Sequence, residues 1–202
     1  MVTPSLELTP NSSPAAAGRP RVVHDDIETV LITEADLARR THELADELRA
    51  HYMGQDLVLV GVLKGAIMFM TDLARALRLP LEMDFMAVSS YGNATQSSGV
   101  VRITKDLDGS IEGRNVLVVE DIVDSGMTLR YLLENLRSRN PASLRVCTLL
   151  NKQVPRKADV EVDLVGFDIP DRFVVGYGLD YAENYRNLPY VGVLKQSVYT
   201  AG

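Results

Sequence analysis

Residues 115–128, Asn-Val-Leu-Val-Val-Glu-Asp-Ile-Val-Asp-Ser-Gly-Met-Thr, decide the fold of this 202-residue chain. The apolar run at 116–119 has the length and the β-branched residues of a strand that is buried in a parallel sheet. Glu120, Asp121 and Asp124 follow, and leucines at helical spacing come after them. Because ligands of open α/β sheets bind at the carboxyl ends of the strands, we expect a binding site where this strand ends.

The turn at 125–128, Ser-Gly-Met-Thr, offers backbone N–H groups and two hydroxyls at the start of a helix, which suits an anion. It lacks the lysine of a P-loop, and the chain contains no Gly-x-Gly-x-x-Gly, which disfavours an NTPase or a dinucleotide-binding protein. Glu120 and Asp121 would repel a bare phosphate, but they can accept hydrogen bonds from a diol or bind Mg²⁺. A ribose 5-phosphate unit therefore fits both parts of the predicted site, with its phosphate at the turn and its hydroxyls at the carboxylates. The alternative is an ordinary helix start with Asp124 as its N-cap.

Length and composition indicate one globular domain. The chain is long enough for one sizeable core, and its net charge of -6 disfavours a general nucleic-acid-binding surface. Cys147 is the only cysteine, which excludes an internal disulfide, suggests a reducing compartment and predicts a small buried residue. No apolar run reaches the about 18 residues of a membrane span. We therefore expect a cytoplasmic protein that binds neither membrane nor nucleic acid.

Apolar runs alternate with helical patterns along the rest of the chain, which predicts an α/β fold with a doubly wound, mainly parallel sheet flanked by helices. Residues 1–20 have the composition of a disordered tail, and the domain is expected at 21–202. Thr33 and Asp36 predict a helix start. Strands are predicted at 56–63, 81–88, 144–150 and 160–167, a helix at 66–77, and short runs at 173–177 and 190–194.

The segment at 89–105 is polar and rich in small residues. Long segments of this kind in compact domains are usually functional, so this one predicts a mobile flap or a protruding hairpin. An inert surface loop is the alternative.

Residues 119–128 resemble the phosphoribosyl pyrophosphate (PRPP) loop of type I phosphoribosyltransferases. From about residue 22 to 192, the chain is similar to the hypoxanthine-guanine branch of that family. The supporting segments are Gly-Val-Leu-Lys-Gly at 61–65, Ser-Ser-Tyr-Gly at 89–92, Asp-Arg-Phe-Val-Val-Gly-Tyr at 171–177, and Leu-Asp-Tyr at 179–181 followed by Arg186. The resemblance implies the type I phosphoribosyltransferase fold, with a small hood built from the N-terminal segment and from about 165–202.

The same resemblance implies a purine salvage enzyme that transfers the 5-phosphoribosyl group from PRPP to N9 of hypoxanthine or guanine. The products would be IMP or GMP and pyrophosphate, and Mg²⁺ would be the cofactor. The family commonly forms dimers or tetramers, so a homodimer or a homotetramer is expected. The alternatives are a xanthine-guanine specificity and a non-catalytic regulator that senses PRPP.

By resemblance, Asp124 is the catalytic residue, which removes or stabilises the N7 proton of the purine. The ribose-phosphate loop comprises Glu120, Asp121, Asp124, Ser125, Gly126, Met127 and Thr128. The pyrophosphate residues are Leu63, Lys64, Gly65 and Arg186, with a cis peptide expected between Leu63 and Lys64. The expected metal ligands are Glu120, Asp121 and Asp180. A plain surface ion pair between Asp180 and Arg186 is the alternative for those two residues.

The acceptor base is assigned to a different set of residues by the same resemblance. Lys152 would contact O6 of the purine, because a cation there selects an oxo group over an amino group. Phe173 would stack on the base, Val174 would present backbone groups to its edge, and Asp180 would lie beside it. Ordinary solvation is the alternative for Lys152, and a short core strand is the alternative for Phe173.

Ser90 and Tyr91 would head a flap that closes over the site and excludes water from the reactive ribosyl group. Three positions depart from the family pattern. Ser125 and Met127 stand where relatives often carry Thr and Lys, and Arg172 stands where Lys is common. Met127 removes a possible positive charge near the phosphate.

Overall fold

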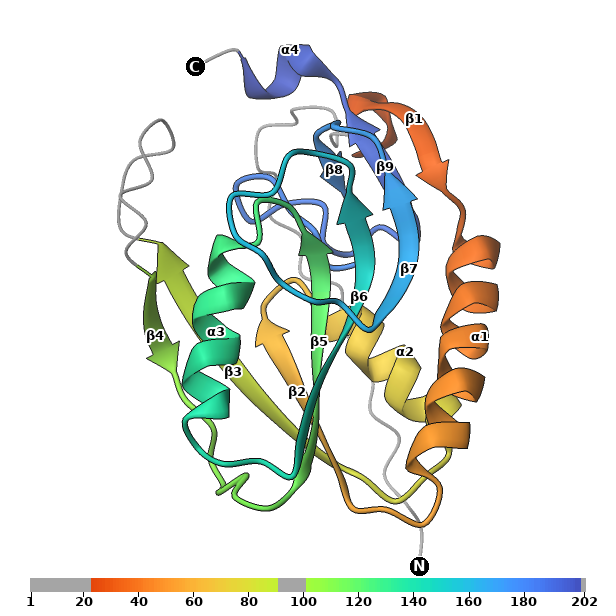
Figure 1. The fold of residues 1–202 in the computed structure, drawn as a ribbon. Coiled ribbons are helices and arrows are strands. Elements are labelled where there is room, and N and C mark those ends of the chain that lie inside the picture. The colour runs from red at the N-terminus through yellow and green to blue at the C-terminus, as the bar shows by residue number, and fades with distance from the viewer. Residues whose placement is uncertain (1–22, 91–100, 201–202) are drawn as a thin grey trace, which may run out of the picture.

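A six-stranded sheet forms the centre of the molecule (Figure 1), in a computed structural model that describes residues 23–90 and 101–200. Its strand order is β4-β3-β2-β5-β6-β7. The strands are β2 (Leu57–Leu63), β3 (Glu82–Ser90), β4 (Val101–Lys105), β5 (Asn115–Val123), β6 (Ser143–Lys152) and β7 (Leu164–Ile169). Neighbours pair in parallel except β3 and β4, which are antiparallel. The predicted α/β fold with a mainly parallel sheet is confirmed.

Helices cover both faces of this sheet, as a doubly wound fold requires. The helices α1 (Glu34–Tyr52) and α2 (Ile67–Leu77) pack on one face, and α3 (Met127–Arg137) packs on the other (Figure 1). Because successive strand residues point to opposite faces, Leu57 and Leu59 join the first core, whereas Val58 and Val60 join the second. The predicted leucine face of α3 is buried and comprises Leu129, Leu132, Leu133 and Leu136.

A second, three-stranded sheet joins the two ends of the described chain. Its order is β1-β9-β8, with β1 (Ile27–Ile32), β8 (Val174–Val175) and β9 (Val191–Leu194) paired antiparallel. The short helices η1 (Val23–Asp26) and α4 (Gln196–Tyr199) flank it. Figure 1 shows this small sheet at the end of the molecule toward which the central parallel strands point. Among the described residues, no helix has the length and apolarity needed to cross a membrane.

Several local predictions agree with the structure. Thr33 caps α1, since its hydroxyl accepts a hydrogen bond from the Asp36 backbone N–H at 3.1 Å. Cys147 is fully buried in β6. The helix expected at 66–77 is α2, with Ala66 as its N-cap.

The strand predicted at 160–167 is wrong at its beginning, because β7 starts only at Leu164. Val160 and Val162 are partly buried against the α3 side of the core without joining a strand. The side chain of Asp163 binds the Val146 backbone N–H at 2.7 Å and Arg145 Nε at 2.8 Å. The apolar side chains of Val160 and Val162 therefore pack against the core from a loop, and they do not belong to a strand.

The segment predicted as a flap or hairpin has described strands at both ends. Ala87 to Ser90 pair antiparallel with residues 101–105, as in the arms of a hairpin. The residues between them, 91–100, include Tyr91 and lie outside the described chain, as does the tail predicted at 1–20. Of Ser90, the structure describes only the backbone.

Candidate active site

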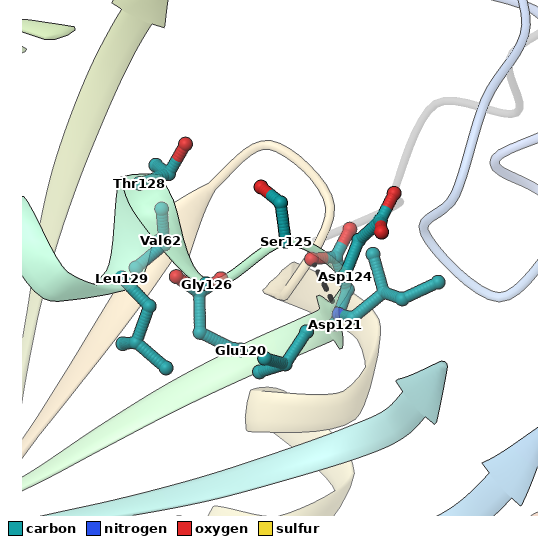
Figure 2. Close-up of a pocket in the computed structure, with 10 residues that line it drawn as sticks. Val62, Glu120, Asp121, Asp124, Ser125, Gly126, Thr128 and Leu129 are labelled. Carbon is teal, nitrogen blue, oxygen red and sulfur yellow. Dashed lines mark hydrogen bonds between the residues drawn. The ribbon is translucent and has the colours of Figure 1, made fainter. Parts of the chain in front are cut away.

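A hollow of about 230 Å³ opens at the carboxyl end of β5, beside the start of α3. Figure 2 shows the acidic and hydroxyl side chains gathered around it. Its lining residues are Val62, Glu120, Asp121, Ile122, Val123, Asp124, Ser125, Gly126, Thr128 and Leu129. Six of the seven predicted ribose-phosphate residues are among them. The side chain of Met127 is 39% exposed and is not part of the lining.

The turn before α3 is built around Gly126, which is the N-cap and has a φ of 79°. A Cβ on Gly126 would lie 2.9 Å from the carbonyl oxygen of Ala158, so both the dihedral angle and the contact favour glycine. The Ser125 carbonyl accepts hydrogen bonds from the backbone N–H groups of Lys157 and Ala158 at 3.0 and 3.2 Å. Because no side chain caps the helix, the alternative of Asp124 as N-cap is wrong.

Asp124 is exposed at the edge of the hollow (Figure 2). Within the part of the chain that the structure describes, its carboxylate makes no hydrogen bond or ion pair. It is therefore available to a ligand and has no visible structural task.

Glu120 and Asp121 differ from Asp124 because they lie in a more buried environment. Burial, together with the neighbouring Asp121 charge, raises the pKa of Glu120 well above its usual range. Burial also raises the pKa of Asp121 to about 6, although a hydrogen bond from the Ile122 N–H and the charge of Arg186 oppose that rise. Both carboxyl groups thus resist ionisation. A bound cation or hydrogen bonds from hydroxyl groups would stabilise their ionised forms.

Oxygen ligands of this kind are the ones that Mg²⁺ prefers. Among the described residues, however, there is no group of three or more His, Cys, Asp or Glu side chains placed to hold a metal. Asp180 is instead occupied, since Arg186 Nη2 lies 2.8 Å from its Oδ1 and the Glu183 N–H donates to its Oδ2 at 2.8 Å. A metal here would need oxygens from the ligand itself.

The loop after β2 packs directly against Asp121. The peptide between Leu63 and Lys64 is cis, as the family resemblance led us to expect. A Cβ on Gly65 would collide with the Asp121 carboxylate, and a Cβ on Gly178 would collide with the Gly65 carbonyl. Only glycine permits these close approaches, so the sequence brings the loop, the end of β5 and the 176–190 segment together.

Arg186 lies on the same side of the site as this loop. Its Nη1 donates to the Gly178 carbonyl at 2.7 Å, and its side chain is 22% exposed. Its Nε is buried and has no hydrogen-bond partner among the described residues. Lys64 extends outward to Glu183, with Nζ 2.8 Å from Oε2. The ion pair between Asp180 and Arg186 therefore exists, and it leaves Nε of Arg186 without a partner among the described residues.

The predicted base-binding residues lie at the ends of β6 and β8. The side chain of Lys152 is 14% exposed, and its Nζ lies 3.1 Å from the carboxylate of Asp171. This is not the environment of an ordinary solvated lysine. Phe173 precedes β8 and is 38% exposed, which a core-strand residue would not be. Val174 is buried in β8 and pairs with Val193.

Some neighbours of the site were not among the site residues predicted from the sequence. Val62, Ile122 and Leu129 line the hollow with apolar surface, and the partner of Lys152 is Asp171. Asp171 lies 19 positions from Lys152 in the printed sequence, and only the parallel pairing of β6 with β7 brings the two together. No sequence pattern indicates such a pair.

Comparisons with known proteins agree with this geometry. The family model described as a phosphoribosyl transferase domain matches residues 31–182. The hypoxanthine-guanine phosphoribosyltransferase of Bacillus subtilis (strain 168) is 58% identical over 174 residues, which are 86% of this chain and 97% of that protein. The one from Mycobacterium tuberculosis (strain H37Rv) is 54% identical over 201 residues, 96% of this chain and 100% of the relative.

A solved structure gives the same result. The crystal structure of a hypoxanthine phosphoribosyltransferase from Staphylococcus aureus superposes with a TM-score of 0.84 at 52% identity, covering 87% of this chain and 96% of that one. Sequence and fold thus agree over most of the chain. The chain belongs to the phosphoribosyltransferase family, in its hypoxanthine-guanine branch.

Proposed function

We propose that this protein is a purine salvage enzyme that transfers the 5-phosphoribosyl group of PRPP to N9 of hypoxanthine or guanine. The products are IMP or GMP and pyrophosphate. The observation that carries the proposal is the hollow at the end of β5, where an anion-binding turn lies beside carboxylates that suit ribose hydroxyls. Relatives named for this branch that cover almost the whole chain support it.

The donor binds across the hollow. The backbone N–H groups at the start of α3, with the hydroxyls of Ser125 and Thr128, hold the 5-phosphate. Gly126 allows the turn, and the outward Met127 adds no charge. Glu120 and Asp121 accept hydrogen bonds from the ribose hydroxyls. The two carboxylates therefore do not contact the negatively charged phosphate.

The pyrophosphate group lies on the side of the cis loop. Leu63, Lys64 and Gly65 present backbone groups to it, and Arg186 lies on the same side of the site. The charge of Arg186 counters the negative charge that develops on pyrophosphate as it departs.

Mg²⁺ is the cofactor in this proposal. Glu120 and Asp121 supply carboxylate oxygens, and Asp180 lies close enough for its charge to act on Asp121. The ion would neutralise the charge on the pyrophosphate. Asp180 would have to share its carboxylate with Arg186, to which it is paired in the structure.

The acceptor base binds between the ends of β6 and β8. Lys152 donates to O6, Phe173 stacks on the ring, Val174 presents backbone groups to the purine edge, and Asp180 lies beside it. Asp124 receives or stabilises the N7 proton as the bond to N9 forms. Ser90 and Tyr91 belong to the flap that excludes water.

The phosphoribosyltransferase domain spans 21–202, the small sheet of β1, β9 and β8 forms its hood, and the tail at 1–20 precedes it. We place the enzyme in the cytoplasm as a homodimer or a homotetramer. Its single, fully buried cysteine is compatible with a reducing compartment.

Turnover with defined bases tests the proposal. With PRPP and Mg²⁺, we expect formation of IMP from hypoxanthine and of GMP from guanine, and no product from adenine, since a 6-amino group cannot accept a hydrogen bond from Lys152. Nucleotide and pyrophosphate release are measured for each base and for xanthine. Equal turnover of xanthine and guanine would support the xanthine-guanine alternative, and no turnover with any base would support a PRPP-sensing regulator.

Removal of divalent cations should lower PRPP binding several-fold, because the charge on pyrophosphate would then face Glu120 and Asp121 without neutralisation. Equilibrium titration with PRPP after EDTA treatment measures this loss. Added Mg²⁺ should restore binding in the wild type, and restore it less well in Glu120→Gln. PRPP affinity that does not change with EDTA would argue against a metal role for these acids.

A further inference from the structure

Phe173, the residue proposed to stack on the base, is part of a group of three aromatic rings. The ring of Tyr199 is stacked on it, with centroids 4.9 Å apart and planes 22° apart. Tyr181 meets it in a T-shaped arrangement with centroids 5.7 Å apart. Tyr199 comes from α4 near the end of the described chain, and Tyr181 comes from the segment that carries Asp180.

The centroid distances show that the two tyrosines leave one face of Phe173 uncovered. The two tyrosine centroids are only 6.5 Å apart, and rings on opposite faces of Phe173 would lie considerably farther from each other. Tyr181 therefore lies beside Tyr199, and neither tyrosine covers the second face of Phe173. The 38% exposure of Phe173 agrees with one covered and one open face.

The helix that carries Tyr199 is fixed to the hood. The Lys195 backbone N–H donates to the Asp26 carbonyl at 2.9 Å, and the Leu194 N–H donates to the Phe173 carbonyl at 2.9 Å. Val198 packs on the small hood core with Leu194 and Tyr185. The Tyr199 ring is thus presented to Phe173 by a short helix whose preceding backbone is hydrogen-bonded to the hood.

We propose that Tyr199 is a positioning residue for the acceptor base, which holds the Phe173 ring so that its free face meets the purine. The inference rests on the proposed function, because it requires a base that stacks on Phe173. A phenylalanine just before a two-residue edge strand, with more than a third of its surface exposed, would otherwise sample several rotamers. Stacking restricts it to one, and the base then binds without having to order the ring.

Tyr199→Ala tests this role. We expect the KM for hypoxanthine to rise about two- to tenfold, the range that the loss of one aromatic pair corresponds to, with kcat and the KM for PRPP unchanged. Tyr199→Phe keeps the ring and should keep the wild-type KM. Gln196→Ala, an exposed position of the same helix, is the matched control. Thermal unfolding verifies that the variants are folded, which the 36% exposure of Tyr199 leads us to expect.

The outcomes separate the inference from the function. A hypoxanthine KM that stays unchanged or falls in Tyr199→Ala, while the wild type turns over hypoxanthine, would overturn the positioning role alone. A lower KM would show that the Tyr199 ring competes with the base. An equal rise in KM for both substrates would indicate a general structural effect and would also overturn the role. Absence of wild-type turnover would overturn the proposed function and this inference together.

Discussion

Asp124→Asn is expected to reduce kcat by about 10²- to 10⁴-fold, the usual contribution of a positioned general acid or base. The amide has the size of the carboxylate but cannot take the N7 proton of the purine. Asp124 is exposed and makes no hydrogen bond or ion pair among the described residues that the substitution would break, so the fold and the PRPP site should be preserved. Steady-state kinetics with hypoxanthine and PRPP measure the loss, and thermal unfolding verifies the fold.

A second acid provides the control for this experiment. Glu134 lies on α3, outside the hollow, and is paired with Arg130 at 2.8 Å on the exposed surface. Glu134→Gln makes the same chemical change a few turns away and should leave kcat at the wild-type value. Turnover of Asp124→Asn within a few-fold of the wild type would remove Asp124 from the chemistry and leave the proton to another group.

The parts of the fold that could be predicted are those whose signal is local. The runs in β2, β5 and β6 are buried on both faces and therefore read as continuous apolar strands. β1 was not predicted, because half of its residues are exposed, only Ile32 is buried, and its partner β9 lies at the other end of the chain. Its pairing depends on long-range contacts that no local pattern describes.

The candidate site divides in the same way. The acids and the turn at 120–128 are contiguous, so the sequence could place them together at the carboxyl end of a strand, although β5 runs on to Val123 and includes Glu120 and Asp121. The packing of Gly65 against Asp121 and the open face of Phe173 arise only when distant segments meet. The raised pKa of Asp121 also depends on burial, which the order of residues does not reveal.

Lys152→Met should lower kcat/KM for hypoxanthine and guanine by about 10- to 150-fold, which corresponds to the loss of one hydrogen bond from a charged donor. Methionine has nearly the same length and is apolar, so it replaces the mostly buried Lys152 side chain, which is 14% exposed, without a large loss of volume. The Asp171 carboxylate that loses its partner is 70% exposed and is solvated by water at little cost. Kinetics with both bases, at saturating PRPP, measure the effect.

A comparison with a variant of Asp171 separates the contact of Lys152 with O6 from the ion pair between Lys152 and Asp171. The ammonium of Lys152 has three N–H donors, so it can keep Asp171 and still donate to the base. Asp171→Asn removes the ion pair but leaves the lysine, and it should retain activity within a few-fold of the wild type. Because an amine at C6 cannot accept this proton, the preference for hypoxanthine over adenine should shrink in Lys152→Met and persist in Asp171→Asn. An equal loss in both variants would show that the ion pair shapes the site, and that Lys152 does not read the 6-oxo group.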